Sequence, residues 1–116
     1  MPKRFIRSFK YAQEGARHTL MTQRNIWIHL AIGGAVVVAA VWLKLSAVEM
    51  ALIALTIAMV IAAEMINTAL EEMVDLVKPE HHPAAALIKN IAAGAVLVAA
   101  LGAVCVGLFI FIPRLI

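Results

Sequence analysis

Long apolar segments alternate with short polar ones along this chain, and the pattern predicts three membrane-spanning helices. They fall at residues 28–45, 48–76 and 89–112. About 20 residues cross the hydrocarbon core of a bilayer, so the last turns of the second helix should emerge into the interface. A short turn joins the first two helices and makes them antiparallel. The polar sequence KPEHHP, residues 78–83, is the predicted loop before the third helix, which we expect Pro113 to end.

The segment before the first predicted span, residues 2–21, has the pattern of an amphipathic helix. Apolar side chains share one face and charged side chains share the other. The apolar face holds Phe5, Phe9, Ala16 and Leu20, and the charged face holds Arg7, Lys10, Glu14 and Arg17. A basic amphipathic helix beside a span is typical of a surface helix that lies in the membrane interface. The alternative is a soluble helix packed against the membrane domain.

The composition excludes an ordinary soluble domain. Of the 116 residues, 64% are hydrophobic and 15% are charged, whereas soluble domains have roughly 45–50% apolar and 25% charged residues. The length fits a single domain over residues 1–116. So short a chain cannot easily enclose a site by itself, which indicates an oligomer. The lone Cys105 can form no intramolecular disulfide and offers no zinc pattern, and we expect no nucleic-acid partner.

The distribution of basic residues predicts the orientation in the membrane. Only Lys44 lies in the turn after the first span, whereas six basic residues precede that span: Lys3, Arg4, Arg7, Lys10, Arg17 and Arg24. The positive-inside rule therefore places the N-terminus in the cytoplasm. With three spans, the loop at residues 78–83 is also cytoplasmic and the C-terminus lies outside. The basic helix and this loop then face the compartment that contains ATP.

The second predicted span carries a row of polar residues on one side. On a helical wheel they share a stripe about 80° wide that runs from membrane depth to the cytoplasmic interface. The row consists of Glu64, Asn67, Glu71, Asp75 and Lys78. Glu72 lies off this stripe and is expected to be a solvated or interfacial charge.

Pairing with basic residues of neighbouring helices would explain Asp75 and Glu72, but it explains Glu64 poorly, because no basic residue is predicted at its depth. An ionisable residue inside a membrane is usually functional. We interpret Glu64 as a general base that Asn67 orients by hydrogen bonding. Glu71, nearer to water, is a candidate oxygen ligand for a divalent cation. Lys89 opens the third span and is a candidate cation for phosphate oxygens, or else a lysine that anchors the helix at the interface.

Several segments of the chain together resemble one family, the prokaryotic membrane diacylglycerol kinases and undecaprenol kinases. The second span contributes EMINTALEEMVDL, and the resemblance continues in RSFKYAQEG, RNIWIHL, PEHHP and IKNIAAGAVLVAA. It implies an all-α integral membrane protein of the bacterial inner membrane, with three spans per subunit and an N-terminal surface helix. It also implies a homotrimer with active sites shared between subunits at the cytoplasmic face.

The resemblance also implies roles for individual residues. Glu64 matches the general base that acts on the lipid hydroxyl, with Asn67 beside it in the motif. Glu71 matches a carboxylate that binds Mg²⁺, and Lys89 matches the lysine on the ATP phosphates. The residues matching the ATP site are Arg4, Tyr11, Gln23, Glu71, Glu80, His82, Lys89 and Asn90.

Two positions depart from the family pattern. Gln23 and Asn90 stand where the family usually has a glutamate that shares the metal and an aspartate. An amide oxygen binds Mg²⁺ more weakly than a carboxylate, which predicts a weaker metal site. The function implied is ATP- and Mg²⁺-dependent phosphorylation of a membrane lipid alcohol, with undecaprenol favoured over diacylglycerol. The alternatives are a catalytically weakened homologue and a small proton or ion transporter that uses Glu64.

Overall fold

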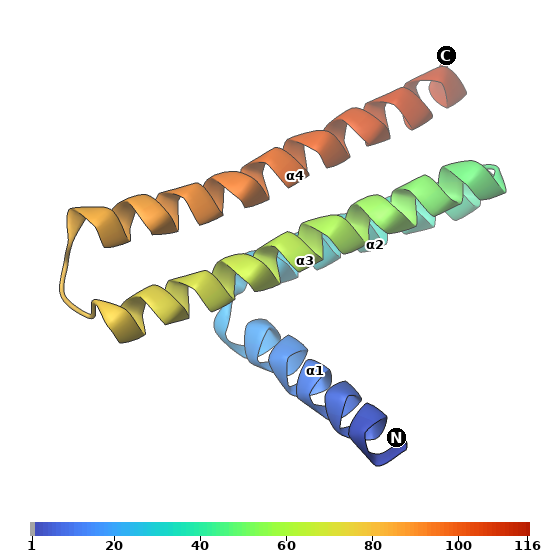
Figure 1. Cartoon of the computed structure of the whole chain (residues 1–116). Coiled ribbons are helices and arrows are strands. Elements are labelled where there is room, and N and C mark those ends of the chain that lie inside the picture. The colour runs from blue at the N-terminus through green and yellow to red at the C-terminus, as the bar shows by residue number, and fades with distance from the viewer. Residues whose placement is uncertain (1) are drawn as a thin grey trace.

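The computed structural model describes residues 2–116 and consists of four helices (Figure 1). They are α1 (Pro2–Thr22), α2 (Arg24–Trp42), α3 (Ala47–Val77) and α4 (Pro83–Leu115). Helices α2, α3 and α4 are long and apolar enough to cross a membrane. The prediction of an all-α protein with three helices of spanning length and composition is therefore confirmed.

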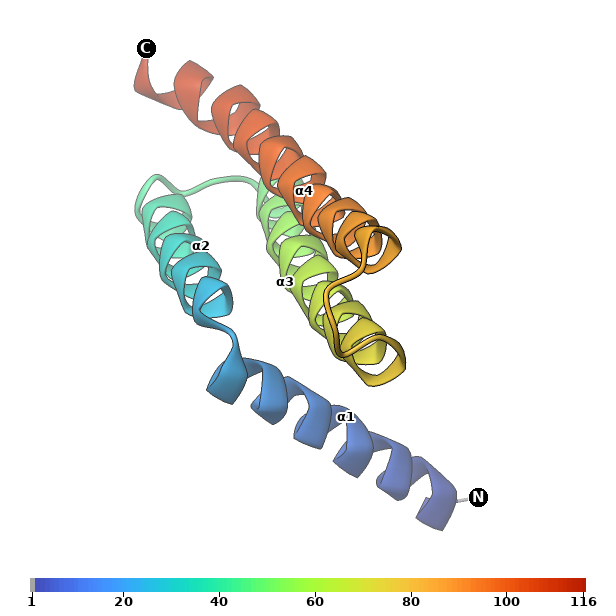
Figure 2. The ribbon, with the colours of Figure 1, turned by 90° about the vertical axis from the view of Figure 1, so that its left-hand side faces the viewer.

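Helix α3 is the centre of the molecule. It packs against α2 on one side and α4 on the other, and the end of α1 reaches both α2 and α3 (Figures 1 and 2). Within residues 2–116, no Cα atom of α2 lies within 8 Å of a Cα atom of α4. The rest of α1 extends away from the three long helices. Groups on α3 are consequently the ones that can meet partners from every other helix.

The turn between α2 and α3 is held by a well-formed set of backbone hydrogen bonds. Leu45 N–H donates to Ala40 O and Lys44 N–H donates to Val41 O, both at 3.1 Å. This is the Schellman arrangement at a helix C-terminus, and it requires the left-handed conformation that Lys44 adopts, with φ of 55°. Leu45 packs against the apolar cluster that contains Ala40. Such a tight turn returns the chain antiparallel, as predicted.

Helix α3 begins with a capping box at Ser46. The Ser46 hydroxyl accepts from Glu49 N–H at 3.2 Å, and the Glu49 carboxylate accepts from Ser46 N–H at 2.9 Å. Arg114 of α4 also donates to Glu49. These contacts tie together the ends of α3 and α4 opposite the loop at residues 78–82.

Helix α4 is longer than the predicted third span at both ends. It begins at Pro83, where the missing N–H of proline costs nothing, and the His82 ring accepts from Ala84 N–H at 3.1 Å. The prediction that Pro113 ends this helix is wrong, because α4 continues to Leu115. A proline inside a helix removes one backbone hydrogen bond and crowds the preceding turn. Only two residues of α4 follow Pro113, so this disturbance affects little of the helix.

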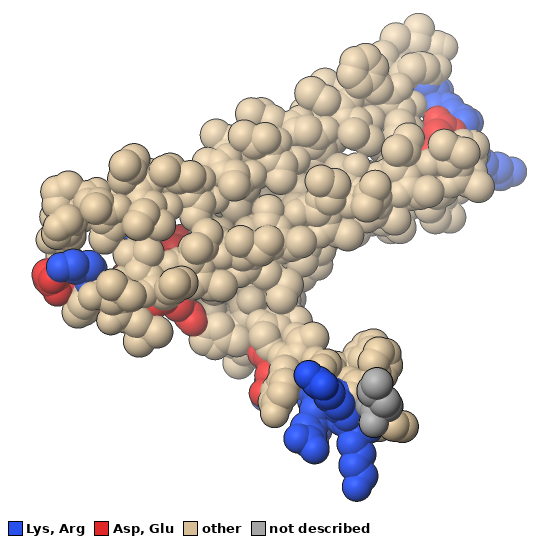
Figure 3. Space-filling view, viewed as in Figure 1, with Lys and Arg blue, Asp and Glu red and all other residues tan. Residues whose placement is uncertain are grey.

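A buried apolar cluster lies toward the end of the bundle near the α2–α3 turn. Ala40, Ile53 and Ile110 are buried there, one from each long helix. Elsewhere many large apolar side chains face outward, including Trp42 and Phe109. The surface between the two ends carries few charges, which gather on α1 and at the ends of the long helices (Figure 3). So large an exposed apolar surface suits contact with lipid or with further subunits.

Candidate functional site

A buried polar group lies on α3 within otherwise apolar surroundings. Its members are Glu64, Asn67 and Thr68, which are 2%, 8% and 3% exposed. Glu64 is the only buried ionisable residue among residues 2–116. Taking a carboxylate out of water is costly unless a partner compensates it, so the contacts of Glu64 decide what it can do.

His29 of α2 supplies that partner. Its Nε2 atom lies 3.0 Å from Glu64 Oε1, and the two side chains are 22% and 2% exposed. The expectation that no basic residue lies at the depth of Glu64 is therefore wrong. Sequence reasoning missed His29, although it is the only ionisable residue between Arg24 and Lys44. An isolated histidine in an apolar span was the available signal.

Asn67 bonds to Glu71 and not, as expected, to Glu64. Asn67 Nδ2 donates to Glu71 Oε1 at 3.1 Å, across one helical turn. The Asn67 oxygen, Oδ1, is buried and has no hydrogen-bond partner within the described part of the chain. Buried polar atoms are rarely left without a partner, and an ion or a water molecule commonly serves as the partner of such an atom.

The Asn67 and Glu71 oxygens fit a magnesium ion in their chemistry. Mg²⁺ binds oxygen ligands and is commonly held by one or two carboxylates together with substrate phosphates and water. Residues 2–116 contain no cluster of three or more histidine, cysteine or acidic side chains able to hold a metal by themselves. A metal here would therefore take only part of its coordination from one chain.

Lys89 of α4 points to α3. Its Nζ atom lies 2.5 Å from Asp75 Oδ1, and the two side chains are 38% and 59% exposed. Ion pairs this exposed contribute about 0–1 kcal/mol, so Lys89 can exchange Asp75 for a phosphate at little cost. The Nζ atom of Lys78 lies 4.0 Å from Oε1 of Glu80 in the adjoining loop.

Glu72, off the polar stripe, also has a basic partner. His18 Nε2 of α1 lies 2.5 Å from Glu72 Oε1, and both side chains are about half exposed. In the half of α3 that carries the polar row, each of the other three helices thus contributes one basic side chain to an acidic residue. These residues are His18, His29 and Lys89.

The remaining residues expected at the nucleotide site are dispersed in the single chain. Arg4 and Tyr11 are exposed on α1, and no hydrogen bond or ion pair joins either side chain to α3 within residues 2–116. Gln23 precedes α2 as its N-cap and makes no side-chain capping bond. Glu80 and His82 belong to the loop before α4, and Asn90 is exposed next to Lys89.

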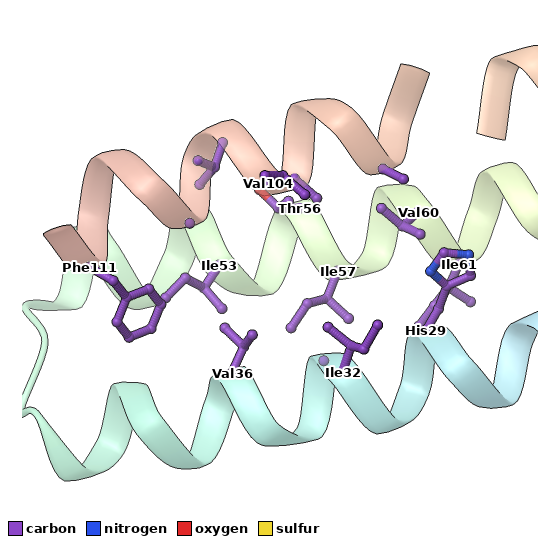
Figure 4. A pocket seen from close by; sticks show the side chains of 15 residues that line it. His29, Ile32, Val36, Ile53, Thr56, Ile57, Val60, Ile61, Val104 and Phe111 are labelled. Atoms are coloured by element: carbon purple, nitrogen blue, oxygen red, sulfur yellow. The ribbon is translucent and has the colours of Figure 1, made fainter. Parts of the chain in front are cut away.

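A cavity of about 280 Å³ opens between α2, α3 and α4, with His29 at one end and Phe111 toward the other (Figure 4). Its lining is aliphatic or aromatic apart from His29 and Thr56. The Thr56 hydroxyl is satisfied within its own helix, since it donates to Leu52 O at 2.6 Å. His29 is therefore the polar end of an apolar space, and it is also the residue that bonds Glu64.

Comparison with known proteins identifies the family. The sequence profile of the prokaryotic diacylglycerol kinases matches residues 10–111. The chain belongs to this family. The match includes the whole of α2 and α3 but not Arg4. The family and its named relatives are lipid kinases, and the polar row on α3 lies within the matched region.

Two relatives resemble the chain over most of its length. An undecaprenol kinase of Bacillus subtilis is 41% identical over 112 residues, which cover 97% of this chain and 91% of the relative. A diacylglycerol kinase of Synechocystis is 47% identical over 109 residues, which cover 93% of this chain. The match spans only 62% of that longer relative. The two names agree on phosphorylation of a lipid and differ in the lipid.

Proposed function

We propose that this chain transfers the terminal phosphate of ATP to the hydroxyl group of a membrane lipid alcohol, and that undecaprenol is preferred to diacylglycerol. The observation that carries the proposal is the placement of Glu64. It is a buried carboxylate in a spanning helix, held by His29, and further polar groups continue from it toward the helix end. This arrangement suits chemistry at the depth where the polar group of a lipid lies.

Glu64 is the general base in this proposal. It accepts the proton of the lipid hydroxyl while that oxygen forms a bond to the terminal phosphorus of ATP, and ADP leaves. A correctly placed base contributes roughly 10²–10⁴ in rate. A helix rises about 1.5 Å per residue, so Asp75 lies about 16 Å along α3 from Glu64. The polar row is long enough to link a lipid hydroxyl to a nucleotide in the cytoplasm.

Asn67 Oδ1 and Glu71 are the groups that would hold Mg²⁺, and Gln23 is a weaker additional ligand. When bound, the ion neutralises charge on the phosphate oxygens. Lys89 adds a second positive charge for the phosphates after it leaves Asp75. Positioning and electrostatic stabilisation of this kind account for most of the catalysis of phosphoryl transfer.

The dispersed residues Arg4 and Tyr11 support a site completed by a second subunit. We therefore propose a homotrimer with shared active sites, in which α1 is a surface helix that brings nucleotide contacts to a neighbouring subunit. Glu80, His82 and Asn90 contribute from the cytoplasmic loop and the start of α4. The excess of basic residues before α2 supports a cytoplasmic N-terminus and site, with the C-terminus outside the bacterial inner membrane.

Two observations favour undecaprenol. The motifs FKYAQEG and PEHHP resemble the undecaprenol kinase branch. The undecaprenol kinase relative also matches nearly end to end, whereas the diacylglycerol kinase relative is considerably longer than the match. The opposing observation is that the diacylglycerol kinase relative has the higher sequence identity, 47% against 41% for the undecaprenol kinase.

The test is transfer of labelled terminal phosphate from ATP to undecaprenol and to diacylglycerol, side by side, with the chain purified in detergent. Wild type should label undecaprenol faster. Glu64→Gln should lose at least about a hundredfold in turnover, because it keeps the size of the side chain but removes the base. Glu72→Gln is the matched control and should retain activity, since Glu72 is exposed and lies off the row.

The outcomes separate the alternatives. A transporter would label neither lipid. A weakened homologue would become active only after Gln23→Glu and Asn90→Asp restore the two acidic residues. Near-normal turnover by Glu64→Gln would show that the base is another residue.

A further inference from the structure

The carboxylate of Glu64 depends on a single protein contact. Within residues 2–116, its one hydrogen bond is the 3.0 Å contact from His29 Nε2 to Oε1. Thr68 donates to the backbone oxygen of Glu64 and not to its carboxylate. A long, unbranched side chain held only by its own helix would have several rotamers available. The contact from His29 is what fixes where the second oxygen, Oε2, is presented.

Resting on the lipid kinase function proposed above, we propose that His29 is a positioning residue, whose Nε2–H holds Glu64 Oε1 so that Oε2 is presented to the lipid hydroxyl. An ionised carboxylate only accepts hydrogen bonds, so the imidazole nitrogen that faces it must carry the hydrogen. The contact therefore selects the tautomer of His29 that carries hydrogen on Nε2. In the neutral ring of this tautomer, Nδ1 carries no hydrogen.

The proton balance is compatible with this role. The hydroxyl O–H bond breaks, the proton moves to Glu64 Oε2, the oxygen bonds phosphorus, and ADP departs. Oε1 remains an acceptor when Oε2 is protonated, so the bond from His29 persists through the step. Release of the proton from Oε2 to water then restores the base. His29 neither gains nor loses a proton in this sequence.

The packing around His29 keeps it in place. Gly33, one turn further along α2, is buried against Ile57 of α3, and an added Cβ atom would lie only 3.3 Å from that side chain. The two helices are thus closely spaced beside the pair. Close backbone packing fixes the position of the imidazole relative to α3, as a positioning residue requires.

Three substitutions separate the hydrogen bond from the volume of the ring. His29→Leu fills the space but donates nothing. The side-chain amide nitrogen of glutamine and Nε2 of histidine are separated from Cα by the same number of bonds. His29→Gln therefore retains a hydrogen-bond donor at a similar distance from the helix. His29→Asn remains polar, but its nitrogen is one bond short. Thr56→Val is the control, because Thr56 lines the same cavity but bonds only Leu52.

Turnover and KM for ATP are measured with the lipid that the wild type prefers, after circular dichroism and elution in detergent have confirmed folding. We expect kcat to fall about ten- to a hundredfold in His29→Leu and His29→Asn, the usual effect of losing a hydrogen bond to a charged group. His29→Gln and Thr56→Val should stay near wild type, and KM for ATP should be unchanged throughout. If His29→Leu does not fold, His29→Asn and His29→Gln provide the comparison.

Turnover of His29→Leu or His29→Asn close to wild type would overturn the role of His29 and leave the lipid kinase function standing. Equal losses in His29→Gln and His29→Asn would also overturn it, because retaining the donor would then give no benefit. A wild-type chain that phosphorylates neither lipid would instead overturn the function on which the role rests.

Discussion

Two adjacent glycines of α2 allow a direct test of how the helix packing supports the site. Gly33 faces α3, where an added Cβ atom would lie 3.3, 3.5 and 3.6 Å from three side-chain carbons of Ile57. Gly34 has no such neighbour within 4 Å in the described chain. Valine at either position carries the same intrinsic helix cost. The difference between Gly33→Val and Gly34→Val therefore isolates the contact between the two helices.

The structure sets the size of the effect. Carbon atoms in contact usually lie about 3.5–4.0 Å apart, so Gly33→Ala requires Ile57 to move only slightly. Valine adds two more carbons, each about 1.5 Å beyond Cβ, in the space that Ile57 occupies. Overpacking of this kind typically costs about 1–3 kcal/mol. We expect the free energy of unfolding to fall by that amount in Gly33→Val and to change little in Gly33→Ala and Gly34→Val.

The assay is thermal inactivation in detergent, followed by turnover well below the inactivation midpoint. Gly33→Val should lower the midpoint and also lower turnover, because moving α2 away from α3 lengthens the contact between His29 and Glu64. Equal midpoints for Gly33→Val and Gly34→Val would refute the packing argument. A lower midpoint for Gly34→Val alone would show that Gly34 packs against a group outside the single chain, and that this contact tolerates valine less well than the contact of Gly33 with Ile57.

Three further results are expected from residues near the two ends of the helices. Lys89→Met should raise KM for ATP about tenfold. Asp75→Asn should leave KM nearly unchanged, because the exposed ion pair contributes only about 0–1 kcal/mol. Equal effects of the two substitutions in steady-state kinetics would argue against a phosphate role for Lys89. Gln23→Glu should lower the Mg²⁺ concentration for half-maximal rate up to about tenfold, or 1.4 kcal/mol, and an unchanged titration would place residue 23 outside the metal site. Glu49→Ala should lower the thermal midpoint because it removes one half of the capping box. Arg114→Gln should lower it less, because it removes only a partly exposed ion pair. Identical thermal midpoints for both variants and wild type would contradict this.

The local features of this protein could be predicted from its sequence. Three apolar segments of spanning length identify three helices, because the free energy of transferring a segment from water to lipid depends on its composition over about 20 residues. The helical repeat also places Glu64, Asn67, Glu71 and Asp75 on one side of α3, since this depends only on spacing within one helix. Glu64 could therefore be selected as a candidate functional residue from the cost of a charge in the membrane.

The partners of those residues were decided by tertiary structure. His29 and Glu64 are 35 positions apart, and their contact depends on the register of α2 against α3. The tight turn at Lys44 and the packing of Gly33 on Ile57 set that register. The structure likewise pairs Asn67 with Glu71 and not with Glu64. A hydrogen bond requires placement within a few tenths of an ångström, and only the packing of whole helices against one another determines position that finely.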